Sequence, residues 1–506
     1  MSGHRRERPV GPPCGRIRRR TFLADVGYGI TGLALGSMLY RDGVARAESP
    51  RVAASPEVWA PPNGLPHHAP KAKSVIWVFL SGGVSHLETW DPKPALNRHA
   101  GKTYEATGIP NPLKSPLFRE RSRAVVGEDR THSQIFPLQV GFKKRGQSGV
   151  EISDWWPELS SCVDDMAFVR SMYTTDNDHA AEFQMHHGRH KLDERQPVLG
   201  SWIHYGLGTL NENLPQFVFL GQYKDPRVRE NFSADYLGPR YGGVELQLDP
   251  NNPLPFGMRP AGVLAEEQAN QFELIHQFNQ LASVEYPQDE QLRARIKAYE
   301  LAYRMQGSVP EAVDLAKETP ETLSLYGIDR EETAVYGRRL LAARRLAERG
   351  VRFTLVYLSD YGEWDSHSDL KNLHSRSCAR VDRPIAGLLK DLKRRGLTDE
   401  VTVVCCTEFG RTPGLEVRPN TPSVTTGRDH HPHAFTVWFA GAGIQRGVVH
   451  GATDELGFHA IEHPHYVTDI HATLLHLMGL ESRKLDIPGR KRLEIDYGQP
   501  IHEILT

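Results

Sequence analysis

Six short, mostly apolar runs spread along the chain constrain its fold more than any other feature. They span residues 74–80, 167–172, 217–220, 352–358, 401–407 and 434–440. Continuous apolar runs of this length predict buried strands. Apolar residues at helical spacing lie between several of them, as in residues 380–395 and 469–478. The alternation predicts an α/β fold, in which a mostly parallel, doubly wound sheet carries helices on both faces.

Residues 264–349 have a different pattern. Apolar side chains recur at helical spacing from Phe272 to Leu281 and again near Leu340. We therefore expect a helical insertion within one α/β domain that spans residues 74–506. Residues 48–73 are rich in proline, alanine and histidine, which predicts a linker or an ordered arm ahead of the domain.

The N-terminus has the features of an export signal. Arg19 and Arg20 begin an R-R-x-F-L pattern, a glycine-rich apolar stretch follows, and Ala45 and Ala47 offer small residues at a cleavage site. We expect residues 1–47 to be a twin-arginine signal peptide and the mature protein to be periplasmic or extracellular. An uncleaved anchor is the alternative. The apolar stretch is too short for a bilayer, so we expect no stable membrane span in the mature chain.

The overall charge excludes one class of partner. The chain has 61 lysines and arginines against 62 acids, a formal net charge of −1. Nucleic acids and anionic membranes are attracted by an extended basic surface, which this balance does not provide. We expect no nucleic-acid partner, and any anion must bind at a local site.

Acids and histidines stand next to the ends of the predicted strands. Ligands bind at the carboxyl ends of parallel strands, so groups that follow different strands can meet at one edge of the sheet. Carboxylate and imidazole ligands together suit zinc, manganese or iron, and calcium also stays open. The alternative is a hydrogen-bonded loop network without an ion. The candidate ligands are His86, Asp91, Asp365, His367, Glu408, Asp429 and His430.

The segment after the second predicted strand offers further groups. Asp176 or Asn177 could cap the helix that follows, and the helix N-terminus could receive an anion. His179, Glu182 and His186 lie at i, i+3 and i+7, so one helix face could carry all three. Elsewhere, Arg411 and Arg428 could hold a tetrahedral oxyanion through paired hydrogen bonds.

Several motifs together resemble a known bacterial family of unknown function, numbered 1501, over roughly residues 70–505. They read S-G-G-V-S-H-L-E-T-W-D-P-K-P from Ser81, G-E-W-D-S-H from Gly362, T-E-F-G-R-T-P from Thr407 and G-R-D-H from Gly427. The family is placed in the alkaline-phosphatase and sulfatase superfamily. The resemblance implies an alkaline-phosphatase-like fold, one or two divalent ions and hydrolysis of phosphate or sulfate esters.

The resemblance also implies roles for particular residues. Asp365 and His367 are similar to one ligand segment of the superfamily, and His430 to its late histidine. Glu408 and Phe409 take the places of aspartate and histidine in the T-x-D-H-G motif. The sulfatase nucleophile position has no cysteine or serine here, which excludes formylglycine chemistry at that place. A neighbouring threonine, Thr174 or Thr175, or a water activated by the ion remain as nucleophiles.

The leading hypothesis is an exported, metal-dependent hydrolase of anionic esters, such as a sulfated glycan. In it, the metal ligands are those named above, and the catalytic group comprises Thr175, His179, Arg411 and Arg428. The alternative hypothesis is a sulfatase-like protein that has lost catalysis and binds a glycan or a protein partner. Phe409 and the absent nucleophile motivate that alternative.

Overall fold

The computed structural model of the chain divides it into two units, Met1–Ala60 and Pro61–Thr506. The predicted signal peptide, residues 1–47, and residues 48–61 of the predicted linker lie outside the described residues. The structure describes residues 62–123, 134–221, 226–249, 251–254, 257–259, 262–285, 290–417 and 426–506.

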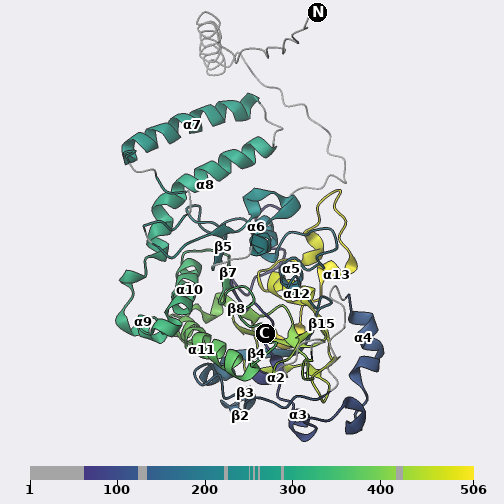
Figure 1. Cartoon of the computed structure of the whole chain (residues 1–506). Helices are drawn as coiled ribbons and strands as arrows, with labels where there is room; N and C mark the ends of the chain where they lie inside the picture. Colours follow the sequence, from purple (N-terminus) through teal and green to yellow (C-terminus); the bar gives the residue numbers. More distant parts are fainter. Residues whose placement is uncertain are drawn as a thin grey trace, which may run out of the picture. The chain divides into compact units, whose positions relative to one another are not determined.

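A nine-stranded sheet forms the centre of the second unit (Figure 1). Its strands follow the order β12-β4-β11-β8-β1-β7-β5-β6, and β15 pairs with β4 beside β12. All six predicted strands are confirmed, as β1, β4, β5, β7, β8 and β11. The strands are β1 Ser74–Phe79, β4 Met166–Tyr173, β5 Phe217–Leu220, β6 Val244–Glu245, β7 Phe353–Tyr357, β8 Val401–Cys406, β11 Phe435–Gly441, β12 Val448–His450 and β15 His465–Tyr466.

The sheet is mainly parallel, as predicted, with one exception. β1 pairs in parallel with β7 and β8, while β11 runs antiparallel to both β8 and β4. Phe79 lies beside Tyr357 and Cys406, so β1, β7 and β8 end at the same level. Because β11 is reversed, the residues that precede it lie at this same edge. Segments after β1, β4, β7 and β8 and before β11 therefore meet at one edge of the sheet.

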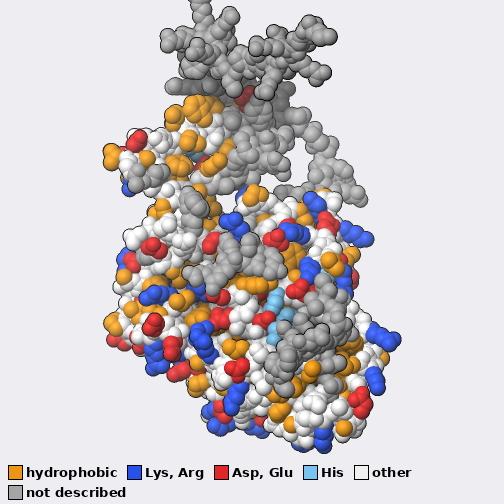
Figure 2. Space-filling view, in the orientation of Figure 1, with side chains coloured by type: hydrophobic (Ala, Val, Ile, Leu, Met, Phe, Trp, Pro, Cys, Tyr) orange, Lys and Arg blue, Asp and Glu red, His pale blue; other side chains and the backbone are white. Residues whose placement is uncertain are grey.

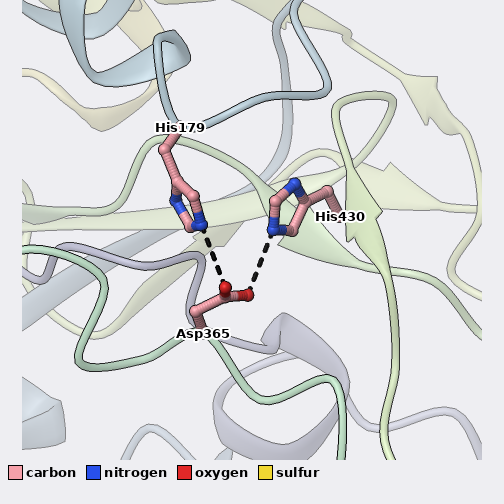
Figure 3. Close-up of side chains that lie close together, drawn as sticks. All are labelled: His179, Asp365 and His430. Carbon is pink, nitrogen blue, oxygen red and sulfur yellow. Dashed lines mark hydrogen bonds and ion pairs between the residues drawn. The ribbon is translucent and has the colours of Figure 1, made fainter. Parts of the chain in front are cut away.

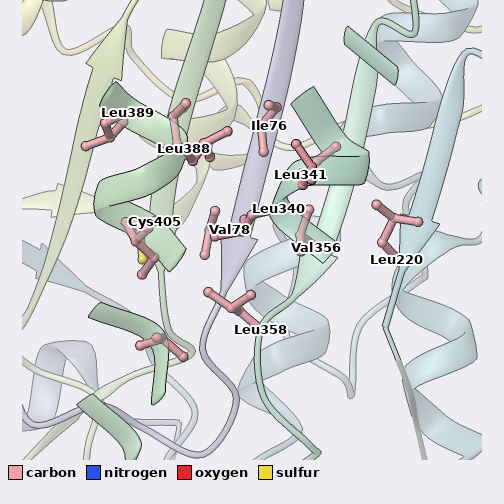
Figure 4. Close-up of a cluster of buried hydrophobic side chains, with 14 of the residues drawn as sticks. Ile76, Val78, Leu220, Leu340, Leu341, Val356, Leu358, Leu388, Leu389 and Cys405 are labelled. Carbon is pink, nitrogen blue, oxygen red and sulfur yellow. The ribbon is translucent and has the colours of Figure 1, made fainter. Parts of the chain in front are cut away.

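Helices cover both faces of the sheet, and alternate side chains of β1 point to opposite faces. Ile76 and Val78 pack with α10 (Glu331–Glu348) and α11 (Leu370–Arg394), as Figure 4 shows. Val75, Trp77 and Phe79 belong to a second core with α5, α6 and α12. These three helices are α5 Ala181–His187, α6 Leu199–Leu207 and α12 Val467–Leu477.

Helices between β6 and β7 fill the segment expected to be a helical insertion. The last helix of this segment, α10, packs on β1 and β7 and therefore belongs to the core of the domain. The part of the segment before α10 is the insertion. None of the helices in the described part of the chain has the length and apolar character that a bilayer crossing requires. The remaining helices are α2 His86–Thr89, α3 Pro94–Arg98, α4 Pro116–Arg121, α7 Ala265–Glu285, α8 Glu290–Val313, α9 Pro320–Leu325 and α13 Glu494–Tyr497.

Three two-stranded sheets lie outside the main sheet. The pair that matters for the site below joins β9 to β10, with Arg411 opposite His430. The pairs are β9 Gly410–Arg411 with β10 His430–His431, β13 Ala452–Thr453 with β14 Ala460–Glu462, and β2 Phe142–Arg145 with β3 Val150–Ser153.

Candidate metal centre

Three histidines converge on the carboxylate of Asp365. Nε2 of His179 lies 3.1 Å from Oδ2. Nε2 of His367 and Nε2 of His430 lie 2.9 and 3.1 Å from Oδ1. Figure 3 shows His179 and His430 pointing at Asp365 from two sides. The two facing Nε2 atoms of His367 and His430 are 3.2 Å apart, so the four side chains form one compact group.

These four residues come from three segments at the same edge of the sheet. His179 lies in the turn between β4 and α5, and Asp365 and His367 lie between β7 and α11. His430 stands in β10, just before the reversed strand β11. The structure thus brings together Asp365, His367 and His430, which the sequence named as ligands, and His179, which it named as catalytic.

The other ring nitrogen of each histidine is held by an acceptor outside the group. Nδ1 of His179 is 3.0 Å from Oε1 of Glu408, and Nδ1 of His367 is 2.5 Å from Oε2 of Glu416. Nδ1 of His430 is 2.8 Å from the carbonyl oxygen of Asn177. The Nδ1 proton of each ring satisfies its outer acceptor, so each Nε2 is directed at Asp365 and donates to it. An ion that replaced these Nε2 protons would meet imidazole nitrogens already oriented as in metal-binding histidines.

Glu408, expected to be a ligand, contacts the group only through His179. Its buried carboxylate accepts hydrogen bonds from the backbone N–H of Gly82 at 2.8 Å and from the hydroxyl of Thr407 at 3.1 Å. Gly82 has a φ of 122° and lies so close to the loop of Asp365 that a Cβ would be 2.6 Å from the Asp365 nitrogen. The glycine therefore lets the end of β1 reach both Glu408 and the Asp365 loop.

Asp429 lies at the rim of the same group. Its Oδ1 accepts a hydrogen bond from the backbone N–H of His430 at 2.8 Å and lies 3.6 Å from Nδ1 of His367. Ligand atoms of His367, Asp429 and His430 all fall within 4.8 Å of one another, as do those of His179, Asp365 and His430. The two overlapping sets share His430.

Arg411 uses each nitrogen of its guanidinium in hydrogen bonds inside the protein. It is fully buried and donates to Oδ1 of Asp365 at 2.8 Å. Its other donors reach the carbonyl oxygens of Gly82, Gly83, Trp364 and Arg428. These bonds join the Asp365 loop to the end of β1 and to the backbone of Arg428. They show a structural role for Arg411, and the oxyanion role expected from the sequence stays a prediction.

Arg428 also forms its ion pair and hydrogen bonds with groups inside the protein. Its guanidinium pairs with Glu88 at 2.7 Å, and both side chains are fully buried. It also donates to four backbone carbonyls and lies over the ring of Phe136. The expected contact between Arg428 and a substrate anion has no support, since a buried charge pair of this kind holds the fold together.

His86, Asp91 and Thr175 are not part of the Asp365 group. Nε2 of His86 lies 2.9 Å from the carbonyl oxygen of Gly457. Asp91 pairs with Lys93 at 3.1 Å and accepts a hydrogen bond from Thr453.

The hydroxyl of Thr175 accepts a hydrogen bond from the side-chain amide of Gln184 at 2.9 Å. Within the described residues, no side-chain hydrogen bond of the three histidines or Asp365 goes to a serine, threonine or cysteine. The structure thus places no hydroxyl nucleophile against this part of the group.

The sequence predicted a side-chain cap for the helix after β4 and one helix face with His179, Glu182 and His186, and the structure agrees with this only in part. The N-cap of α5 is Ala180, which forms no side-chain cap, and Oδ1 of Asp176 instead accepts a hydrogen bond from the N–H of Asp178. His186 is buried and lies 3.2 Å from the hydroxyl of Tyr357, so it belongs to the core. Glu182 remains near the site, where it accepts hydrogen bonds from Ser81 and Tyr357.

The charges within the group shift the pKa of each member. Burial favours the neutral form of Asp365, but hydrogen bonds from His179, His367 and His430 outweigh it and hold its pKa well below the usual range. Burial also lowers the pKa of His179, yet its bonds to Asp365 and Glu408 raise that pKa to about 10. Burial lowers the pKa of His430 to about 4. One firmly ionised carboxylate therefore faces imidazoles of different basicity.

A pocket of about 320 Å³ opens beside His179. Figure 2 shows histidine side chains next to acidic ones at the surface on this side of the molecule. Two cations lie on the pocket wall. Lys191 pairs with Asp178 at 2.7 Å, and Arg195 pairs with Glu230 at 3.0 Å. The lining residues are His179, Ala180, Glu182, Phe183, Lys191, Arg195, Val228, Glu230, Asn231 and Tyr361.

The model of one protein family matches residues 72–505 of the chain, and its description is "Protein of unknown function (DUF1501)". The chain belongs to the DUF1501 family. This confirms the family that the sequence motifs indicated. A comparison with curated proteins found no match.

Among solved structures, this DUF1501 chain is similar to the PsFucS1 sulfatase from Pseudoalteromonas sp. The identity is 11%, the match covers 86% of this chain and 72% of that one, and the TM-score is 0.32. It is also similar to the phosphonate monoester hydrolase SpPMH from Silicibacter pomeroyi, at 11% identity, 69% and 71% coverage and a TM-score of 0.34. The periplasmic domain of EcEptC from Escherichia coli, in complex with zinc, gives 10% identity, 88% and 96% coverage and a TM-score of 0.35. These likenesses are too distant to assign this chain an activity.

Phe409 makes one wall of the metal centre in this DUF1501 chain. Its ring centroid lies 4.4 Å from that of His430 and 5.6 Å from that of His179. Phe409 is fully buried, so it excludes water from one side of the two imidazoles. The position where the superfamily motif has histidine thus supplies packing here and no ligand.

Sequence reasoning missed two groups that orient the centre. Glu416 holds His367 and is fully buried, and the carbonyl oxygen of Asn177 holds His430. Glu416 follows no predicted strand directly, and a backbone carbonyl has no residue type to recognise. The only sequence signal was that Asn177 stands near His179 in a segment already identified as functional.

Proposed function

We propose that this chain is a metal-dependent hydrolase of phosphate or sulfate esters. The observation that carries the proposal is that Nε2 of His179, His367 and His430 all face the Asp365 carboxylate, while each Nδ1 is held by an outer acceptor. This pattern fixes the tautomer and the direction of metal-binding imidazoles. A hydrogen-bonded loop network needs neither the common centre nor three oriented rings.

The spacing of the donor atoms fits a small cation. Two ligand atoms at 2.0–2.1 Å from a tetrahedral zinc ion lie about 3.3 Å apart. The three separations from Asp365 to the histidines and the one between His367 and His430 are 2.9 to 3.2 Å. Three imidazole nitrogens with a carboxylate suit zinc, manganese or iron, whereas calcium takes oxygen ligands. The donor set therefore disfavours the calcium that the sequence had left open.

The residues around this position support hydrolysis of an anionic ester. A divalent ion held there supplies Lewis acidity toward an ester oxygen. Arg411 keeps Asp365 in place and offsets its charge. His179 borders both the Asp365 group and the adjacent pocket, so an ester bound at the centre extends its leaving group into that pocket. The hydroxyl of Thr175 accepts a hydrogen bond from Gln184, and within the described residues no side-chain hydrogen bond of the three histidines or Asp365 goes to a serine or threonine. We therefore assign the attack to water and not to Thr175.

Lys191 and Arg195 take over the anion-binding role that the sequence predicted for Arg411 and Arg428. Both lie on the pocket wall, and both are partly exposed, with 24% and 53% of their side-chain surface accessible. A charged or sulfated substrate that enters the pocket passes these cations before it reaches His179. A bidentate guanidinium contact with a sulfate or phosphate suits Arg195 in particular.

One observation favours the second hypothesis, a sulfatase-like protein that binds a glycan or protein partner without turnover. Both buried arginines are used for structure, so neither Arg411 nor Arg428 is placed to stabilise charge that develops on a transferred group. In that case the centre holds its ion as a structural or ligand-binding element.

Turnover and metal content measured on the same samples separate the two functions. The mature protein is purified without a polyhistidine tag, and Asp365→Asn and His430→Gln are compared with His502→Gln, an exposed histidine outside the group. For a hydrolase, cleavage of generic aryl phosphate or aryl sulfate disappears together with the equivalent of metal held at the Asp365 group in the first two variants only. Bound metal without turnover of either ester across pH favours the binding protein, and absence of both contradicts the proposal.

We also propose that the protein acts outside the cytoplasm, since the R-R-x-F-L pattern at Arg19 and Arg20 is typical of twin-arginine export. Replacing both arginines with lysine should leave the full-length precursor in the cytoplasm, as followed by cell fractionation. Unchanged export of that variant contradicts this part of the proposal.

A further inference from the structure

A second group of metal-ligand side chains lies beside β4, at the sheet edge that β12 and β15 form, apart from the Asp365 group. Nε2 of His450 is 3.0 Å from Nε2 of His465 and 3.9 Å from Oε2 of Glu503. Ligand atoms of these three residues all fall within 4.8 Å of one another. Two facing imidazoles and a carboxylate are a donor set that suits a transition metal.

The sheet topology brings the two histidines together. His450 ends β12 and His465 begins β15, and both strands pair in parallel with β4. His450 lies beside Val169 of β4, and His465 lies beside Met172. The intervening residues 451–464 leave the sheet and return to it, so the two histidines mark the two ends of this segment.

A third histidine stands next to the pair. His463 has a φ of 45°, in the left-handed region that is uncommon for residues other than glycine, although histidine adopts it more often than most. Its carbonyl oxygen accepts a hydrogen bond from Ser171 at 2.6 Å, and its ring centroid lies 5.2 Å from that of His450. This turn places the His463 ring on the same side as the other two.

An outer acceptor orients His465. Nδ1 of His465 is 2.9 Å from Oδ2 of Asp469, and Oδ1 of Asp469 accepts the backbone N–H of Gln499 at 2.8 Å. The carboxylate is therefore itself fixed, and it directs Nε2 of His465 toward His450. A carboxylate that holds the far nitrogen of an imidazole is the usual support of a metal-binding histidine.

We propose that His450, His465 and Glu503 hold a structural zinc-like ion, with His463 as the fourth ligand. Ligand atoms around a tetrahedral zinc lie about 3.3 Å apart, and the observed 3.0 and 3.9 Å bracket that value. With four protein ligands the site is closed, so its role is to stabilise the fold. The ion joins both ends of residues 451–464 to the C-terminal turn that contains Glu503.

Residues 451–464, which the ion would hold at both ends, form hydrogen bonds with β10 and the turn after it, next to His430. Nε2 of His431 is 2.5 Å from the carbonyl oxygen of Phe458. The N–H of Ala460 donates to the carbonyl oxygen of His433 at 3.1 Å. An ion at His450 and His465 therefore stabilises the backing of β10 without touching the Asp365 group.

The test uses the full chain, without a polyhistidine tag, in a background that lacks the first site. In the Asp365→Asn, His430→Gln background, zinc binding is measured by calorimetry and by the change in Tm. We expect about one equivalent of zinc to bind and to raise Tm, because an ion that binds the folded state stabilises it. Adding His450→Gln and His465→Gln should abolish both effects.

Glu503→Gln provides a milder variant, because 54% of the Glu503 side-chain surface is exposed and the change buries nothing. It should weaken zinc binding by about 10-fold or more while the fold persists. His502→Gln, at the exposed neighbouring position, is the matched control and should bind zinc as the background does.

Two results would overturn the proposal: no zinc uptake by the background, or uptake that survives the His450→Gln, His465→Gln change. If the background takes up no zinc, His450 and His465 are simply two imidazoles joined by a hydrogen bond. If the ester-hydrolase proposal fails instead, this site still binds zinc in the wild-type chain, so the two proposals fail separately.

Discussion

Nε2 of His367 and Nε2 of His430 lie 3.2 Å apart, and both face Oδ1 of Asp365. Two imidazole nitrogens and a carboxylate oxygen at this spacing repel one another unless a proton or a cation lies between them. The buried acceptors behind the rings leave little freedom to relieve that repulsion by rotation. In the structure the histidine protons fill this role, and the proposed cation would take their place, with consequences that can be measured.

Glu416→Gln should weaken metal binding without removing a ligand. Glu416 holds Nδ1 of His367 at 2.5 Å, and its loss of charge makes the imidazole a poorer, less well oriented donor. Outer partners of this kind are worth about 10- to 100-fold in metal affinity. Competition with a chelator measures the change. Glu455→Gln, which alters an exposed pair with Arg98, is the control; equal affinities in both variants would contradict the assignment.

Arg411→Met should destabilise the protein, not merely weaken substrate binding. The fully buried guanidinium serves Asp365 and four backbone carbonyls, so its removal leaves those acceptors unpaired. Breaking a buried charge pair costs about 3–5 kcal/mol. Denaturant unfolding in the presence of chelator measures this loss. A variant of unchanged stability with a raised KM would instead restore the substrate-binding role expected from the sequence.

Arg195→Ala should raise KM for an anionic ester and leave stability almost unchanged. The side chain lies on the pocket wall, is half exposed, pairs with Glu230 and lies over the ring of Phe183. Loss of one charge-assisted contact with the substrate is worth about 10-fold in kcat/KM. Steady-state kinetics on aryl sulfate and aryl phosphate test this, with Arg483→Ala, an exposed arginine far along the chain, as control. An unchanged KM would exclude Arg195 from substrate binding.

Stability should fall as the pH drops from about 6.5 to 4. Burial lowers the pKa of His204 and of His471 to about 4 and that of His433 to about 3. The unfolded chain takes up these protons near pH 6.5. The stability gained from keeping these side chains neutral is therefore complete above pH 6.5. It falls as the pH drops below the pKa of the unfolded chain and is lost once the pH has passed the lower pKa values of the folded protein.

Denaturant unfolding at several pH values measures this slope. His471→Gln should reduce it, because glutamine can still donate to the carbonyl oxygen of Met185, as His471 does at 2.7 Å. His502→Gln, at an exposed position, should leave the slope unchanged. A slope that is the same in wild type and His471→Gln would contradict the prediction.

The sheet and the edge that carries the centre could be predicted from the sequence, because buried parallel strands are long apolar runs. The reversed direction of β11 could not, since its composition resembles that of β8. That reversal is what brings His430 to the carboxyl edge. The prediction of His430 came from the acids and histidines that stand beside the predicted strands and from its family motif, and the strand topology now supplies the physical reason.

The partners of buried charges could not be predicted either. Arg411 and Arg428 stand in motifs beside acids and histidines, which is compatible with substrate binding and with internal pairing alike. Only the fold reveals that Glu88, far away in the chain, pairs with Arg428. His86 illustrates the same limit: it follows the glycine turn after β1, but α2 begins at this residue and its ring reaches Gly457.

The most direct test is an anomalous difference map from crystals of the zinc-loaded protein. The account predicts a peak within about 2–2.6 Å of Asp365 and of the Nε2 atoms that face it. A fully occupied crystal without a peak there, in which His179, His367 and His430 still bond directly to Asp365, would contradict it.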